Sequence, residues 1–275
     1  RGLGDVYKRQ MIGAIIGDIA GSRFEFDNYR KKDFELIAPG CSPTDDSVMT
    51  IALGKAILGC NGNYANLSQR AIECMQEFGR RYPNCGFGGM FRRWIHSEDP
   101  QPYGSFGNGA AMRVSGAGFA ARSLEETKEL SYKITCVSHN HPEGLKGAEA
   151  VAVAIFLARQ NKTKREIRQY IEANYYKIAF TLDEIRPTYR FNETCQETVP
   201  QAFEAFFEAD GFEDTIRNAI SIGGDSDTLA AIAGSIAEAY YGVPMALRFQ
   251  AENILSNKKF LPLFYWLDKF EEIYP

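Results

Sequence analysis

Two acidic clusters lie far apart in the chain, and each comes directly before a long stretch of apolar and small residues. Residues 43–47 read Pro-Thr-Asp-Asp-Ser, and residues 223–228 read Gly-Gly-Asp-Ser-Asp-Thr. Carboxylates that a fold brings together repel one another unless a cation lies between them. The pattern therefore favours a fold in which the N-terminal ends of two core helices meet at a shared metal site.

The donor atoms in these clusters favour one class of metal. They are carboxylate and hydroxyl oxygens, which suit Mg²⁺, Mn²⁺ or Ca²⁺ better than zinc or copper. Adjacent carboxylates at a helix start point in different directions and can serve two ions. Either cluster alone could be a helix N-cap, but the two together favour a binuclear site. The candidate ligands are Thr44, Asp45, Asp46, Asp225, Asp227 and Thr228.

A third segment, residues 17–25, reads Gly-Asp-Ile-Ala-Gly-Ser-Arg-Phe-Glu and adds two more carboxylates. Its small residues suggest a turn that contacts a substrate rather than a regular helix. Glu25 joins Asp45 and Asp46 as a candidate catalytic residue. Asp18 is a candidate for substrate binding, with structural support of the turn as the alternative.

Helical signals recur along the chain and strand signals are scarce, so we expect an all-α fold. Residues 145–158 and 229–241 are apolar or small nearly all round, which predicts helices buried on every side. The spacing of Ser and Glu in 123–126, and of Thr and Glu in 163–166, is that of capping boxes. We expect roughly ten or more helices around central ones that carry the metal ligands.

Composition excludes several classes of protein. A net charge of −4 and a pI near 5.6 give no sign of a dedicated nucleic-acid or anionic-membrane surface. The longest strongly apolar run, residues 150–158, is far shorter than the roughly 20 residues that span a bilayer. The six cysteines contain no C-x-x-C pair, so they suggest reduced thiols and a cytoplasmic location.

The chain contains no linker or repeat that would divide it, so we expect a single domain over residues 11–275. Residues 1–10 have neither the apolar core of a secretion signal nor helical periodicity. We interpret them as extraneous residues before a natural start at Met11, and we exclude them from the fold.

Residues 105–113 form a glycine-rich loop that reads Ser-Phe-Gly-Asn-Gly-Ala-Ala-Met-Arg. Free backbone amides, a carboxamide and an aromatic ring would suit phosphate oxygens and a stacked base. The glycines do not follow the dinucleotide-binding or P-loop order, and a plain turn is the alternative. The candidate substrate-binding residues here are Ser105, Phe106, Gly107, Asn108, Gly109, Ala110 and Met112.

Two of the three histidines, His139 and His141, are two residues apart in a His-Asn-His-Pro segment. A zinc pair is one interpretation, but no third soft ligand is close in the sequence. We therefore favour hydrogen bonds from both to a substrate or to the glycine-rich loop. His96 has no supporting pattern, and we expect it at the surface.

Taken in order, these motifs resemble those of the ADP-ribosylglycohydrolase family. The resemblance covers nearly all of residues 11–241, and the combination is specific although no single motif is. The family includes hydrolases that remove ADP-ribose from arginine, from serine or from ADP-ribose polymers, and a lens crystallin relative. The motifs are Gly-Asp-x-x-Gly-Ser ending at Glu25, Pro-Thr-Asp-Asp-Ser, Gly-Asn-Gly-Ala-Ala-Met-Arg, His-x-His-Pro and Gly-Gly-Asp-Ser-Asp-Thr.

The resemblance implies a compact orthogonal bundle of helices that holds two Mg²⁺ or Mn²⁺ ions. It assigns the six oxygen ligands to these ions and places Glu25 beside them as a catalytic residue. Residues 105–110 would surround the diphosphate and distal ribose of an ADP-ribosylated substrate. His139, with His141 two residues later, would contact the same ligand.

By this resemblance the protein hydrolyses the glycosidic bond between ADP-ribose and an acceptor. Rupture of that bond develops oxocarbenium character, and divalent ions can orient the ribose diol and activate water. Glu25 is the first choice for proton transfer, and residues 26–40 and 84–104 would shape the entrance. The acceptor stays open. The alternatives are a metal-dependent nucleotide-sugar phosphohydrolase and a non-catalytic ADP-ribose binder; we expect a monomer.

Overall fold

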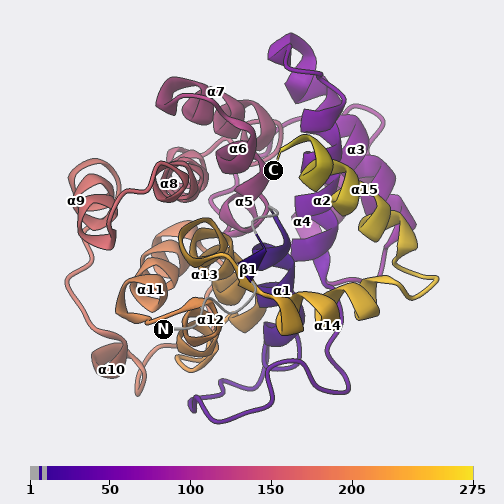
Figure 1. The fold of residues 1–275 in the computed structure, drawn as a ribbon. Coiled ribbons are helices and arrows are strands. Elements are labelled where there is room, and N and C mark those ends of the chain that lie inside the picture. The colour runs from indigo at the N-terminus through magenta and orange to yellow at the C-terminus, as the bar shows by residue number, and fades with distance from the viewer. Residues whose placement is uncertain (1–5, 8–10, 275) are drawn as a thin grey trace.

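Helices make up nearly all the regular structure of the computed structural model, which describes residues 6–7 and 11–274 (Figure 1). The all-α prediction is confirmed. The helices of the first half are α1 (Ile12–Gly21), α2 (Asp45–Leu58), η1 (Tyr64–Asn66), α3 (Leu67–Arg81), α4 (Gly89–His96), α5 (Gly109–Met112), α6 (Ser115–Ala120) and α7 (Leu124–Thr135). Those of the second half are α8 (Pro142–Arg159), α9 (Lys164–Asn174), α10 (Leu182–Ile185), α11 (Cys195–Glu208), α12 (Phe212–Ile220), α13 (Ser226–Tyr241), α14 (Met245–Leu255) and α15 (Leu261–Ile273).

Two short strands form an antiparallel pair, β1 (Val6–Tyr7) with β2 (Val243–Pro244). Residues 6–7 thus lie against the rest of the domain, although we had excluded all of residues 1–10 from the fold. The remainder of that segment, residues 1–5 and 8–10, lies outside the described residues. The natural start at Met11 stays a prediction.

Helices α1 and α13 lie in the middle of the molecule, with α9 and α10 on one side and α3 and α15 on the other (Figure 1). α13 is buried from Ser226 to Glu238, and α8 is buried along most of its length. The prediction that residues 145–158 and 229–241 form buried helices is confirmed. None of the helices in the described part of the chain is both long and apolar enough to cross a membrane.

Three glycines on one face of α1 let its backbone touch that of α13. Gly13, Gly17 and Gly21 are four residues apart, so they align along the helix. A Cβ atom at Gly17 would lie 2.0 Å from the carbonyl oxygen of Ala230, and one at Gly21 would lie 2.5 Å from that of Ser226. The last turn of α1 therefore lies directly on the first turn of α13.

The other end of this helix pair is held by a side-chain cap. The Oε2 atom of Glu238, in the last turns of α13, accepts hydrogen bonds from the backbone N–H groups of Met11 (3.0 Å) and Gly13 (2.8 Å). These amides have no partner within α1, because the first N–H groups of a helix have no preceding carbonyl. The cap fixes how far α1 extends along α13.

One of the two predicted capping boxes is complete. Thr163 and Glu166 exchange both hydrogen bonds at the start of α9. Ser123 caps α7 by accepting from the Glu126 N–H, but the Glu126 carboxylate accepts from the N–H of Arg122 instead of Ser123. The second box is therefore only half formed.

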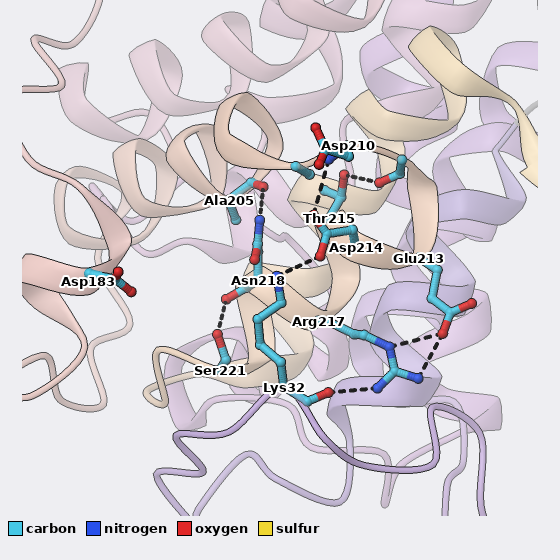
Figure 2. A network of polar contacts seen from close by, with 12 residues as sticks. Lys32, Asp183, Ala205, Asp210, Glu213, Asp214, Thr215, Arg217, Asn218 and Ser221 are labelled. Atoms are coloured by element: carbon cyan, nitrogen blue, oxygen red, sulfur yellow. Dashed lines mark hydrogen bonds and ion pairs between the residues drawn. The ribbon is translucent and has the colours of Figure 1, made fainter.

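The long connection between α1 and α2 is held by α12 (Figure 2). Lys32 forms an ion pair with Asp214 at 2.5 Å, and Arg217 donates to the carbonyl oxygens of Lys32 (2.8 Å) and Phe34 (2.7 Å). These bonds hold residues 32–34 against α12. The connection is thereby fixed beyond the segment that carries Glu25.

We expect Gly17→Ala to destabilise the protein by about 3 kcal/mol, because the new methyl group meets a backbone carbonyl that cannot move without separating the two helices. The free energy of unfolding in urea measures this change. The matched control is Gly89→Ala in α4, where no described atom lies within 4 Å of the added Cβ. The control should change stability by less than about 1 kcal/mol; similar losses for both variants would contradict the close contact.

Candidate active site and metal centre

Asp18, in the last turn of α1, holds the first turn of α2. Its buried carboxylate accepts from the backbone N–H of Thr44 (2.9 Å) and Ser47 (3.0 Å), from the Thr44 hydroxyl (2.6 Å) and from the Ser47 hydroxyl. These bonds satisfy amides that a helix leaves without partners at its start. Asp18 does not line the cavity described below, so the structure places it in the supporting position that we considered as the alternative.

The expectation of an irregular turn over residues 17–21 is wrong, because these residues continue α1 as a helix. Glycine usually weakens a helix, but here Gly17 and Gly21 allow the close packing of α1 on α13. The irregular backbone begins after Gly21 and carries Glu25.

The two acidic clusters meet. Gly223 and Gly224 have φ angles of +74° and +76°, a conformation that favours glycine, and they turn the chain into α13 so that Asp227 lies in its first turn. The Thr228 hydroxyl then donates to Oδ1 of Asp46 at 3.3 Å. This bond joins the start of α13 to the start of α2.

The donor set fits a hard divalent cation. Among the described residues, none donates a hydrogen bond to the buried Oδ2 atom of Asp46. Carboxylate oxygens of Glu25, Asp225 and Asp227 all lie within 4.8 Å of one another. Burial raises the pKa of Asp46 and Asp227 well above the ordinary value, and the neighbouring carboxylates raise it further. A bound cation would reverse this effect.

Thr44 has a different environment from the other candidate ligands. Its hydroxyl donates to Asp18 and accepts from the Asp46 N–H at 3.3 Å, and it does not line the cavity. Asp45 does line the cavity, and its backbone N–H donates to the Cys85 carbonyl at 2.8 Å. The role of Thr44 as a metal ligand stays a prediction.

Glu25 is held beside the second cluster by its neighbours in the chain. The Ser226 hydroxyl donates to the Phe24 carbonyl (3.3 Å), and the Gly224 N–H donates to the Asn28 side chain (3.2 Å). Partial burial, followed by the charges of Asp227 and Asp18, raises the pKa of Glu25 to about 8. A carboxylate next to so much negative charge binds a proton or a cation readily.

The clusters open into a cavity of about 550 Å³. Its lining combines carboxylates from the starts of α2 and α13 and from Glu25 with residues of the glycine-rich loop and of α4. The cavity is large enough for a nucleotide-sized ligand. Its lining includes Glu25, Asp45, Asp46, Asp225, Asp227, Thr228, Ser105, Phe106, Gly107, Asn108, Gly109, Met112 and His139.

The glycine-rich loop is tied to the metal centre and to the start of α11. The Asn108 side chain donates to Asp225 Oδ2 at 2.7 Å, and its backbone N–H donates to the Glu193 carbonyl at 2.7 Å. The Gly107 N–H donates to the Ser105 hydroxyl at 3.1 Å. The loop therefore offers fewer free amides to a ligand than the sequence suggested. Ala110 is buried behind it and does not line the cavity.

The two histidines have separate positions. His139 lines the cavity, whereas Nδ1 of His141 caps α8 by accepting from the Glu143 N–H at 3.1 Å. The ring of His141 also lies 5.1 Å from that of Phe106, which is 40% exposed. His141 does not line the cavity, and its contact with a ligand stays a prediction. His96 is exposed, as expected.

Several cavity residues were not among our candidates. Residues 84–104 do shape the cavity, as expected, through Gly86, Met90, Phe91, Arg93 and Tyr103. Residues 26–40 are absent from its lining among the described residues. Glu193 and Thr194 were missed because a single acidic residue between Asn and Thr carries no pattern. Arg113 is the last residue of the glycine-rich segment, and this position was the only indication in the sequence that it belongs to the site.

Comparisons with known proteins identify the family and the fold. The sequence model of the ADP-ribosylglycohydrolase family matches residues 3–259. ADP-ribosylhydrolase ARH3 of Homo sapiens is 24% identical over 313 residues, covering 85% of this chain and 84% of that protein. ADP-ribosyl-dinitrogen reductase glycohydrolase of Rhodospirillum rubrum is 26% identical over 260 residues, covering 84% of each. A solved structure described as an ADP-ribosylglycohydrolase-related protein complex has a TM-score of 0.65 at 20% identity, covering 96% of this chain and 98% of that chain, and so shares the fold.

We expect Asp18→Asn to destabilise the protein by about 2 kcal/mol, because the new amide N–H₂ faces donors at the start of α2. Ser47→Ala removes one of the same hydrogen bonds and should cost about 1 kcal/mol. Urea unfolding of both variants tests the difference. Equal stabilities for the two variants would show that Asp18 does not hold α2.

We expect Mg²⁺ or Mn²⁺ to stabilise the protein, since binding relieves repulsion between the carboxylates. At a hundredfold excess over Kd the gain is about 2.7 kcal/mol, which raises Tm by on the order of 5 °C in a domain of this size. EDTA should reverse the shift. Asp46→Asn should remove most of it, whereas Asp183→Asn, whose parent side chain is 87% exposed, should keep it. A response retained by Asp46→Asn would place the cation elsewhere.

Proposed function

The chain belongs to the ADP-ribosylglycohydrolase family, and from that premise we propose that it is a metal-dependent hydrolase that releases ADP-ribose from a modified acceptor. The hydrogen bond from Asn108 to Asp225 carries the proposal, because it joins the loop that would hold the diphosphate to the carboxylates that would hold the metal. A ligand bound to that loop therefore lies next to the metal centre. Two Mg²⁺ or Mn²⁺ ions suit the number of carboxylates present.

The ligands proposed for these ions are the carboxylates of both clusters with the hydroxyl of Thr228, and Thr44 as a further candidate. When bound, such ions would orient the ribose diol and make water more acidic near neutral pH. The Thr228 hydroxyl and the Asp46 carboxylate are already oriented by their mutual bond. These two donors are therefore held together before an ion binds.

Glu25 is the residue that we propose for proton transfer. Its carboxylate lines the cavity at the end where the acidic residues gather, and two hydrogen bonds to neighbouring residues limit its movement. Water that attacks C1 of the distal ribose loses a proton, which a Glu25 oxygen can accept when bound cations lower the raised pKa of this carboxyl. The same proton can then pass to the departing acceptor as the C1 bond breaks, so that Glu25 returns to its starting state.

The acceptor would lie at the part of the cavity lined by Glu25 and Glu193. Phe26 follows Glu25 in the chain but does not line the cavity; it is 80% exposed, and its ring lies 5.7 Å from that of Phe191. Glu193, two residues after Phe191, lines the cavity. We propose that these residues contact the acceptor. The release assay described next distinguishes ADP-ribose linked to arginine, to serine or to another acceptor.

The test is release of free ADP-ribose from ADP-ribosyl-arginine, ADP-ribosyl-serine and ADP-ribosylated nucleic acid, each with Mg²⁺, with Mn²⁺ and with EDTA. We expect metal-dependent release from at least one of them. Glu25→Gln should lower kcat by about a hundredfold or more while ADP-ribose still binds, and Asp45→Asn should abolish turnover. Asp183→Asn is the matched control and should have the rate of the unmodified protein.

Other products would support the alternatives. AMP and a ribose phosphate would identify a phosphohydrolase that cuts the diphosphate. Metal-dependent binding of ADP-ribose without release from any conjugate would favour a binding protein. Hydrolysis at an undiminished rate in Glu25→Gln would leave the glycohydrolase assignment standing but remove Glu25 from proton transfer.

A further inference from the structure

A buried arginine and a buried histidine form part of the cavity wall. Arg113, directly after α5, is 1% exposed, and its guanidinium carbon lies 4.8 Å from the centre of the Phe91 ring. Its Nη2 atom donates to the Ser138 hydroxyl at 2.7 Å and lies 3.1 Å from Nδ1 of His139. A charged side chain so fully buried needs a function or compensating bonds.

The geometry determines which nitrogen of His139 carries the proton. A guanidinium can only donate hydrogen bonds, so Nδ1 of His139 must accept from Arg113. The Ser138 hydroxyl lies 2.9 Å from the same nitrogen, and because its oxygen accepts from Arg113, its own proton can also point to Nδ1. A neutral imidazole has one N–H group, which is therefore at Nε2.

The charge state of His139 agrees with this tautomer. In the described part of the chain, the titratable side chains found against the ring are Arg113 at Nδ1 and Tyr103, whose ring centre is 5.6 Å away. Burial, followed by the nearby positive charge of Arg113, holds the pKa of His139 well below its ordinary value. Burial raises the pKa of Tyr103, so that phenol also stays neutral.

The protonated nitrogen faces the glycine-rich loop. A Cβ atom at Gly109 would lie 3.4 Å from Nε2, and one at Gly107 would lie 3.6 Å from it. Both glycines and His139 line the cavity. The Nε2–H group is thus beside the region where the proposed ligand carries its diphosphate and distal ribose, both rich in oxygen acceptors.

We propose that Arg113 is a positioning residue: it keeps His139 in the neutral form whose Nε2–H donates to an oxygen of the bound ligand. The identity of that ligand rests on the proposed function, whereas the tautomer does not. Arg113 also lines the cavity, but it is only 1% exposed and its Nη2 atom is engaged by Ser138 and His139, so in this proposal it acts through the imidazole.

The first test is ¹⁵N NMR of the imidazole rings in the unmodified full-length chain. Only three histidines are present, so His96→Asn and His141→Asn suffice to assign the signals. We expect a single neutral tautomer for His139, protonated at Nε2, that does not titrate between about pH 6 and 8, where an ordinary histidine with a pKa of about 6.5 does. A proton at Nδ1, or titration in that range, would overturn the proposal without a substitution of Arg113 or His139.

The second test compares Arg113→Met, Arg113→Lys and Ser138→Ala, each checked for thermal unfolding. Removal of the guanidinium should allow both tautomers and raise the pKa of His139. Ser138→Ala should keep the Nε2–H tautomer because Arg113 still donates, and Arg113→Lys should restore it in part. An unchanged tautomer and titration in a folded Arg113→Met variant would show that Arg113 does not control His139.

The third test measures binding of ADP-ribose with Mg²⁺ by calorimetry in a double-mutant cycle. Arg113→Met should weaken binding on the order of ten- to a hundredfold, the range for one lost hydrogen bond to a charged ligand. His139→Gln, which places an N–H₂ group near the Nε2 position, should bind more tightly than His139→Asn. In the His139→Gln background Arg113→Met should have much less effect, and an equal effect in both backgrounds would show that Arg113 acts directly.

These measurements separate the two proposals. If ADP-ribose does not bind but His139 carries its proton at Nε2 under the control of Arg113, then the proposed function fails and the positioning role stands. If ADP-ribose is released from a conjugate while His139 carries its proton at Nδ1, then the function stands and the positioning role fails.

Discussion

The contact between α1 and α13 is the constraint on which the rest of the structure depends. Because Gly13, Gly17 and Gly21 have no side chains, the last turn of α1 lies on the first turn of α13. In the same last turn Asp18 holds the start of α2 through four hydrogen bonds. A single helix therefore places both acidic clusters, and segments about 180 residues apart in the chain meet in one cavity.

Bringing the two acidic clusters together costs electrostatic free energy, and the hydrogen bonds around them do not remove this cost. The carboxylates of Asp46 and Asp227 are buried near other acids, and their pKa values are raised as a result. A protein selected for stability alone would avoid such a cluster. The large core around α8 and α13 offsets the cost, and a divalent cation would turn the repulsion into binding energy. Buried carboxylates are placed next to one another, against the usual preference for paired or exposed charges, at the site where we expect function.

The sequence predicted the helices and acidic residues of the site better than the hydrogen bonds between distant residues that hold them together. The all-α fold, the two buried helices and the clusters at helix starts follow from hydrophobic pattern and residue type. Residues 17–21 were misjudged because glycine weakens a helix locally, and the reason for Gly17 and Gly21 is their contact with the backbone of α13. The amides of Gly107 and Asn108 were expected to be free, but one bonds the Ser105 hydroxyl and the other a carbonyl 85 residues away. Glu193 contacts Asn108 and Arg113 contacts His139, both distant in the sequence, and a local pattern does not predict such contacts.

The most direct measurement is anomalous diffraction from crystals of the protein grown with Mn²⁺. If α1 brings the two clusters into one metal centre, anomalous density will lie between Asp46 of α2 and Asp227 of α13, in contact with carboxylates from both helices. Density at one cluster alone, or none at saturating Mn²⁺, would contradict the account. In that case the acidic residues would be separate helix caps, and the proposed hydrolase would lose its metal centre.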